Sequence, residues 1–167
     1  MKKNFQELIN DCLDTVDEIF PWDLQNSMET EQTPLLLDIR EPYEFETLHI
    51  KGAINVPRGI LESACDYGYD DTKPELVSAR EQDIIVICRS GLRSVLAAHT
   101  MQLMGYQSVK SLKTGVKGWN DFELPLQNAH GHMIDVDDAD EMLMPKVKPE
   151  QMPPSKRTQM AGRTDFA

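Results

Sequence analysis

The chain has 167 residues, of which 40% are hydrophobic and 27% charged, and its formal net charge is −11. This length and composition predict one globular domain with extensions, large enough to bury a core without disulfides or metal ions. The acidic charge excludes an extended nucleic-acid surface, and no apolar run approaches the roughly 18 residues that a membrane span needs.

The cysteines indicate a reducing compartment. Cys12, Cys65 and Cys88 are odd in number and do not have the spacing of a metal site. The residues after Met1 also lack the apolar core of a signal peptide. We therefore expect free thiols, no bound metal, no membrane partner and a cytoplasmic protein.

An amphipathic helix is predicted at the N-terminus. Apolar residues recur at helical spacing over 5–16, and Asn4 is placed to cap the helix. We assign residues 1–15 to this segment. Cys12 lies on its apolar stripe, where a small buried hydrophobe is expected rather than a redox group.

A strand, a helix and a second strand follow. Residues 16–20 resemble the short first strand of the family identified below, and Pro21 suits the first turn of a helix that runs to about residue 28. After a polar loop at 29–34, the apolar run at 35–39 predicts a buried strand. The alternation of strands and helices favours an α/β fold with a parallel sheet.

Asp38 and Arg40 lie at the carboxyl end of this second strand. They could form a structural ion pair that orders a nearby loop, or they could act directly in catalysis. A carboxylate beside a reactive thiol would disfavour the thiolate form. We therefore favour the structural role.

The next segment contains two further candidate residues. Residues 41–47 predict a short helix, and residues 53–56 a third strand that ends at a proline. His49 could be a general base, but a thiolate nucleophile needs no base, and in the family motif identified below this histidine holds the turn between helix and strand. Arg58 follows the strand and is either a solvated surface residue or a second anion contact.

Residues 61–80 are less regular and rich in acidic residues, tyrosine and glycine. Lys73 and Pro74 resemble a helix start, and we expect the segment to overhang the functional pocket. Cys65 lies within it. It could reach Cys88 as a resolving thiol, but nothing in the spacing indicates this, and we favour a bystander.

The most informative stretch is a β-branched run at 84–87 followed by Cys88, a polar loop with Gly91, and a helical pattern from Ser94 to Met104. Cys88 is therefore expected between a buried strand and a helix N-terminus. Loop amides and the positive end of the helix dipole meet there and favour a thiolate. Arg89 and Arg93 add positive charge nearby, as expected for an anion cradle.

The C-terminal third contains one more strand and then changes character. Residues 108–112 predict a fifth strand, 114–118 a loop, and Trp119 begins a short closing helix and packs in the core. Residues 128–167 form a Pro- and Met-rich extension that contains one short helix, at 135–144. We expect an arm that wraps its own domain, a second copy or another partner, unless it is disordered.

Two motifs resemble the rhodanese family of sulfurtransferases. Cys-Arg-Ser-Gly-Leu-Arg-Ser at 88–94 looks like the rhodanese active-site loop. The stretch 35–57, with its Asp-Ile-Arg and His-Ile-Lys-Gly-Ala-Ile-Asn-Val-Pro segments, is similar to the other rhodanese signature. The resemblance covers about residues 15–127. It implies a three-layer α/β/α fold with a mainly parallel five-stranded sheet over residues 16–127, an N-terminal helix and an extended C-terminal tail.

The resemblance also implies a function. Cys88 would carry sulfane sulfur as a persulfide, from thiosulfate or a related donor to cyanide, a thiol or a sulfur-relay protein. No cofactor is expected, and a homodimer could form through the tail. The residues expected to bind the donor or shape the loop are Arg89, Ser90, Gly91, Leu92, Arg93, Ser94 and Arg58, with Asp38 and Arg40 in support.

Two other functions stay open. Phosphatase or arsenate-reductase chemistry can use a cysteine–arginine loop, but only four residues, 89–92, separate Cys88 from Arg93. That is one fewer than in those relatives of the fold, and the shorter loop is too tight for a phosphoryl group. The other is a non-catalytic binding module, which the intact cysteine disfavours.

Overall fold

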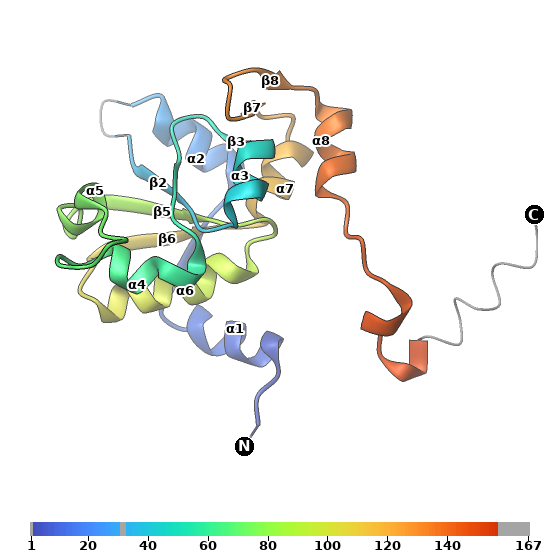
Figure 1. Cartoon of the computed structure of the whole chain (residues 1–167), viewed down its shortest axis with the longest axis horizontal. Helices are drawn as coiled ribbons and strands as arrows, with labels where there is room; N and C mark the ends of the chain where they lie inside the picture. The colour runs from blue at the N-terminus through green and yellow to red at the C-terminus, as the bar shows by residue number, and fades with distance from the viewer. Residues whose placement is uncertain (1, 31–32, 157–167) are drawn as a thin grey trace, which may run out of the picture.

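A five-stranded parallel sheet forms the centre of the computed structural model, which describes residues 2–30 and 33–156 (Figure 1). The strand order is β1-β6-β5-β2-β4, and every neighbouring pair is parallel. The strands are β1 (Asp17–Ile19), β2 (Leu35–Asp38), β4 (Ile54–Asn55), β5 (Asp83–Ile87) and β6 (Ser108–Leu112). All five strands were predicted, although β4 is shorter than expected.

Helices cover both faces of the sheet. They are α1 (Phe5–Leu13), α2 (Pro21–Met28), α3 (Pro42–Thr47), α4 (Leu61–Ala64), α5 (Pro74–Val77), α6 (Leu92–Leu103), α7 (Gly115–Asp121) and α8 (Val136–Leu143). Proline occupies the first turn of α2, α3 and α5, where its missing N–H costs no hydrogen bond. Asn4 and Glu7 form a capping box that begins α1.

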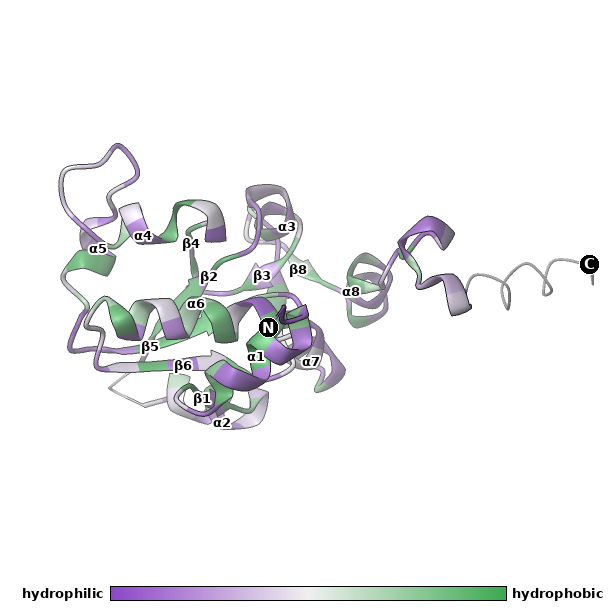
Figure 2. Cartoon of the chain, turned by 90° about the horizontal axis from the view of Figure 1, so that it is seen from below, coloured by the Kyte–Doolittle hydropathy of each residue, from purple (hydrophilic) through white to green (hydrophobic). Residues whose placement is uncertain are grey.

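The core is divided by the sheet into two layers. Successive residues of β2 and β5 point to opposite faces: Leu37 and Val86 join one cluster, with α6 and α4, and Leu36 and Ile85 join the other, with α2, α7 and α8. Figure 2 shows the apolar residues on the central strands and inner helix faces. Each fully buried aliphatic side chain contributes about 1.5–3 kcal/mol, so both faces hold the central strands in register.

A second, smaller sheet joins the domain to its C-terminal extension. It is antiparallel, in the order β3-β7-β8, with β3 (His49–Ile50), β7 (Leu126–Gln127) and β8 (Met133–Ile134). The sequence analysis did not predict it, because strands of two residues have no detectable alternation. His130 and His132 lie in its hairpin, and no metal-binding cluster of three or more His, Cys, Asp or Glu occurs in the described part of the chain.

Helix α7 begins earlier than predicted, and it contains Trp119. The expected loop at 114–118 is wrong, because α7 already begins at Gly115 and ends before Phe122. Glycine usually disfavours a helix interior, but Gly115 is the first residue of α7, where it has a φ of +60°. Trp119 is buried as predicted.

Parts of two other predicted segments lie outside the described residues: 31–32 of the polar loop and 157–167 of the arm. The predicted short helix in the extension is observed as α8. The segment after α8 runs away from the domain as far as it is described (Figure 1). No helix within the ranges 2–30 and 33–156 is long and apolar enough to span a membrane.

Candidate active site

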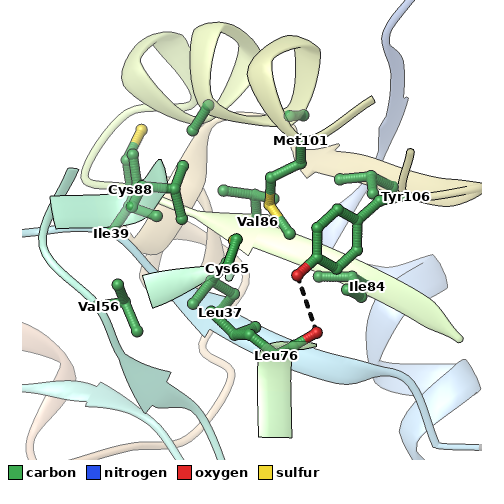
Figure 3. Packing of buried hydrophobic residues seen from close by; sticks show 14 of the residues in the cluster. Leu37, Ile39, Val56, Cys65, Leu76, Ile84, Val86, Cys88, Met101 and Tyr106 are labelled. Atoms are coloured by element: carbon green, nitrogen blue, oxygen red, sulfur yellow. Dashed lines mark hydrogen bonds between the residues drawn. The ribbon is translucent and has the colours of Figure 1, made fainter. Parts of the chain in front are cut away.

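Cys88 follows the last residue of β5, and its thiol faces the first turn of α6. The Ser94 amide donates to Cys88 Sγ at 3.3 Å, and Ser94 Oγ lies at the same distance from it. In Figure 3 the sulfur points away from the packed cluster toward that helix. An N–H from the first turn of a 12-residue helix stabilises negative charge on a thiolate or a persulfide.

A buried hydroxyl network holds Ser94 in place. Ser94 Oγ donates to the Gly91 carbonyl at 3.0 Å and lies 2.8 Å from Ser111 Oγ on β6. Ser94 and Ser111 are both fully buried. The network therefore links Ser94 on α6, which hydrogen-bonds the Cys88 sulfur, to strand β6. Ser111 was not predicted as a site residue, since no motif surrounds it in β6.

The first turn of α7 holds the cysteine loop through backbone hydrogen bonds. Val116 N–H donates to the Cys88 carbonyl and Lys117 N–H to the Arg89 carbonyl, each at 2.9 Å. A Cβ on Gly115 would lie 2.3 Å from the Cys88 carbonyl oxygen, and one on Gly91 would lie 2.8 Å from a backbone nitrogen of the other segment. These two segments therefore approach too closely for any residue but glycine.

Arg93 forms a bidentate ion pair with Glu44 of α3. Its Nη1 and Nη2 donate to the two carboxylate oxygens at 3.0 and 2.9 Å. Burial alone would raise the pKa of Glu44. Hydrogen bonds from Arg93 and the Glu41 amide, together with the charges of Arg93 and Arg40, outweigh this effect, so the pKa of Glu44 is lowered. The hydrogen bonds that Arg93 donates to Glu44 are also the main cause that raises the pKa of Arg93. No local pattern in the sequence indicates Glu44 as this partner.

Asp38 and Arg40 form a buried ion pair, which fits the structural role favoured above. Arg40 Nη2 lies 2.6 Å from Asp38 Oδ2 and donates to the Leu48 carbonyl at 2.8 Å. Asn55 Nδ2 donates to the carbonyls of both residues. The pair thus joins the ends of β2 and β4 to the segment after α3. Satisfied hydrogen bonds make the burial of two charges tolerable.

His49 also makes structural contacts. Its Nδ1 donates to the Phe45 carbonyl at 2.8 Å, and its Nε2 lies 3.2 Å from Gln127 Nε2. Its ring stacks on Phe45 with centroids 4.0 Å apart. These contacts fit the expected role in the turn between α3 and β3.

The remaining predicted site residues lie in different surroundings. Ser90 is exposed, and Leu92, the first residue of α6, packs against the first core cluster. Arg58 pairs with Glu62 at 2.9 Å and donates to Thr100 Oγ1 at 3.2 Å. It does not line the cavity described next, so its anion contact stays a prediction.

A cavity of about 300 Å³ adjoins the loop at Arg89. It is lined by Arg40, Tyr43, Glu44, Thr47, Leu48, Arg89, Met142, Leu143, Met144 and Lys146. The Arg89 guanidinium donates to the Leu143 carbonyl at the end of α8 through Nε, at 3.1 Å, and Nη2. The segment 61–80, expected to overhang the pocket, contributes none of these residues. That expectation was wrong, because the end of α8 and the residues after it line this side of the cavity.

Cys65 has the surroundings of a bystander. It is fully buried, and burial raises the pKa of its thiol. Burial likewise raises the pKa of the neighbouring Tyr106 phenol, which donates to the Leu76 carbonyl at 2.8 Å (Figure 3). A protonated thiol is a poor nucleophile, so these surroundings argue against a resolving role.

Comparison with known proteins places this loop in a family. The family model "Rhodanese-like domain" matches residues 21–122, more than half of the chain. The chain belongs to the rhodanese-like family. The match includes Cys88 with its whole loop and ends before α8.

Curated relatives of this rhodanese-like chain have sulfur-transfer names. "Putative sulfur carrier protein YrkF" of Bacillus subtilis is 30% identical over 105 residues, which are 63% of this chain and 51% of the relative. "Adenylyltransferase and sulfurtransferase UBA4" of Candida albicans is 30% identical over 115 residues, 66% of this chain and 25% of the relative. The chain thus spans about half or less of these proteins' length.

Solved structures share the rhodanese-like fold. A Rhodopseudomonas palustris protein of unknown function, described as a possible tyrosine phosphatase, has a TM-score of 0.67 and 27% identity, over 76% of this chain and 96% of its own. Thiosulfate sulfurtransferase from Pseudomonas aeruginosa has a TM-score of 0.61 and 22% identity, over 83% of this chain and 25% of its own. At 22% identity the second comparison supports the fold alone.

Proposed function

We propose that this rhodanese-like protein is a sulfurtransferase that carries sulfane sulfur as a Cys88 persulfide, with thiosulfate or a related sulfane as donor. The observation that carries the proposal is the Ser94 N–H aimed at Cys88 Sγ from the first turn of α6. A donor in that position stabilises both the thiolate that attacks and the persulfide that results. We assign the reaction to residues 16–127.

The proposed reaction has two displacement steps. In the first, the Cys88 thiolate attacks the outer sulfur of thiosulfate, the donor's S–S bond breaks, and sulfite leaves with the electron pair. In the second, cyanide or a thiolate attacks the outer sulfur of the persulfide, and the Cys88 thiolate is the leaving group. Charge is conserved in each step, and neither step requires a cofactor.

The loop residues divide the remaining work. The amides of residues 89–94 hold the transferred sulfur, and Arg93 binds the sulfonate of the donor after exchange from Glu44. Arg89 adds positive charge beside the loop, and Arg58 is proposed as a more distant anion contact. The names of the relatives make a sulfur-relay protein a reasonable acceptor, and the three free cysteines fit the cytoplasm.

The phosphatase alternative has one observation in its favour, the description of the Rhodopseudomonas palustris structure. Against it, only four residues separate Cys88 from Arg93, and a loop of that length is too tight for a phosphoryl group. The binding-module alternative offers no reason for a helix N–H directed at the thiol. Sulfur transfer therefore fits the site best.

Intact mass after thiosulfate treatment tests the proposal. Wild type should gain about 32 Da in a form that reductant removes, and Cys88→Ser should not. Cys65→Ser is the matched control and should still gain the sulfur. A gain that persists in Cys88→Ser, or no gain in wild type, would overturn the mechanism, and hydrolysis of an aryl phosphate by wild type would then support the phosphatase alternative.

A further inference from the structure

The cavity beside the loop has walls from two parts of the chain. One wall lies within the family-matched residues 21–122 and includes Arg40, Arg89 and residues of α3. The other wall comes from the C-terminal extension and is formed by Met142, Leu143, Met144 and Lys146. We propose that the cavity is a subsite for the anionic end of an organic sulfur substrate, and that the extension completes it. This proposal rests on the sulfurtransferase function proposed above and specifies its substrate class.

The extension is anchored to the domain through α8, whose last residues begin the wall. Ala139 and Leu143 are buried in the second core cluster. Asn120 Nδ2 on α7 donates to the Val136 carbonyl at 3.0 Å and to Asp140 Oδ1 at 2.9 Å. Pairing of β7 with β8 fixes the approach to α8. Met142 and Leu143 of the wall therefore belong to a docked helix, and Met144 and Lys146 follow directly after its end.

The charges of the cavity favour an anion. Arg40 is neutralised by Asp38, and Glu44 by Arg93. Arg89 is held by a carbonyl and not by an acid, and Lys146 forms no ion pair with any residue in 2–30 or 33–156. Two positive charges thus remain in the cavity of a chain whose net charge is −11, so the attraction for an anion is local.

The apolar walls favour an organic body on that anion. Met142, Met144 and Tyr43 are largely exposed at the cavity, and Leu48 lies behind them. Methionine side chains adapt to ligands of irregular shape. The volume of about 300 Å³ lies at the lower end of small-molecule sites. An inorganic thiosulfate ion would leave these apolar surfaces uncovered.

The position of Arg89 links the cavity to the chemistry. Its guanidinium lines the cavity, while its backbone follows Cys88 directly. An anion bound at Arg89 is therefore held next to the cysteine loop, although Cys88 itself is fully buried and does not line the cavity. For transfer, the substrate sulfur has to reach the Cys88 thiolate from this position.

Donors and acceptors can share this chemistry. An organic thiosulfonate would give its outer sulfur to the Cys88 thiolate as its S–S bond breaks, and a sulfinate would leave with the electron pair. A mercaptoalkanesulfonate thiolate would take the outer sulfur of the persulfide and release the Cys88 thiolate. Both place a sulfur at one end and an anion at the other.

Binding is measured without turnover, in Cys88→Ser, with benzenesulfonate as the probe and methyl-labelled methionines observed by NMR. The Met142 and Met144 methyl signals, assigned with Met→Leu variants, should shift, and the signal of the buried Met101 should not. Lys146→Glu should weaken binding about fivefold or more. Lys156→Glu, the same change in the extension away from the cavity, is the matched control.

Kinetics distinguish donor from acceptor. If the donor is the occupant, Lys146→Glu raises KM for benzenethiosulfonate more than for thiosulfate; if the acceptor is, it raises KM for mercaptoethanesulfonate more than for mercaptoethanol. No methyl shift, or equal weakening by the two lysine variants, would overturn the subsite. Persulfide formation in wild type would still stand in that case, so the subsite and the sulfurtransferase function fail separately.

Discussion

The Glu44–Arg93 pair makes a specific prediction about substrate affinity. In the unliganded protein Glu44 occupies both outer nitrogens of the arginine proposed to bind the donor's sulfonate. An anionic donor must displace this carboxylate. Glu44→Gln removes the negative charge but keeps an amide that can hydrogen-bond the guanidinium, so the fold should persist while anion binding improves.

The magnitude follows from the exposure of the pair. The Arg93 side chain is 37% exposed and that of Glu44 16%, so solvent screens the attraction and its net value is about 1 kcal/mol. That energy corresponds to about a fivefold lower KM for thiosulfate in Glu44→Gln. The assay is the rate of Cys88 persulfide formation against thiosulfate concentration at neutral pH.

Glu46→Gln is the matched control, since it makes the same change on the exposed side of the same helix. Its KM should equal that of wild type. An unchanged or higher KM in Glu44→Gln, with native circular dichroism, would refute the idea that the donor's anion binds Arg93.

The same pair predicts a dependence of stability on pH. The folded-state pKa of Glu44 is lowered from its ordinary value of 4.5. A carboxyl of this kind contributes stability that is fully present above the unfolded pKa and is lost as pH falls through the folded pKa. Urea unfolding of wild type and Glu44→Gln should therefore differ most above pH 4.5 and converge in more acidic solution. A difference that grows with acidification would contradict the assignment.

Three further substitutions separate loop support from chemistry. Gly115→Ala should cut persulfide formation at least about tenfold, because its Cβ would meet the Cys88 carbonyl, whereas Gly131→Ala, with a similar positive φ but open space, should alter only stability. Ser111→Ala should lower the free energy of unfolding by about 1 kcal/mol and reduce kcat rather than raise KM, since it frees Ser94. His49→Ala should cost about 1–3 kcal/mol in urea unfolding, yet leave the activity per folded molecule near wild type.

The buried strands and the cysteine loop were predictable because their signals are local. The run at 84–87 identifies a central strand, and Cys88 with Gly91 and Arg93 follows within six residues. Helix starts at Pro21, Pro42 and Pro74 were equally local. Strand, loop and helix must then bring the cysteine to the carboxyl edge of the sheet in any parallel arrangement.

The partners of the loop were not predictable in the same way. Glu44 lies 49 positions before Arg93, and Ser111 lies 17 after Ser94. Several carboxylates and hydroxyls in the chain have the right chemistry, and only packing selects one of them. The two-residue strands of the small sheet were missed for a related reason, since their pairing depends on neighbours and not on their own pattern.

The sequence by itself determined a parallel α/β domain with a cysteine at a helix N-terminus, because periodicity and short motifs encode both. Only the tertiary structure decided that Arg93 is neutralised by Glu44 and that α8, beyond the family-matched residues, forms a wall of the cavity. A segment without a sustained hydrophobic period, such as the C-terminal extension, can still dock on the domain through a few apolar side chains and side-chain hydrogen bonds. Such docking depends on the shape of the surface it meets, which no stretch of sequence describes alone.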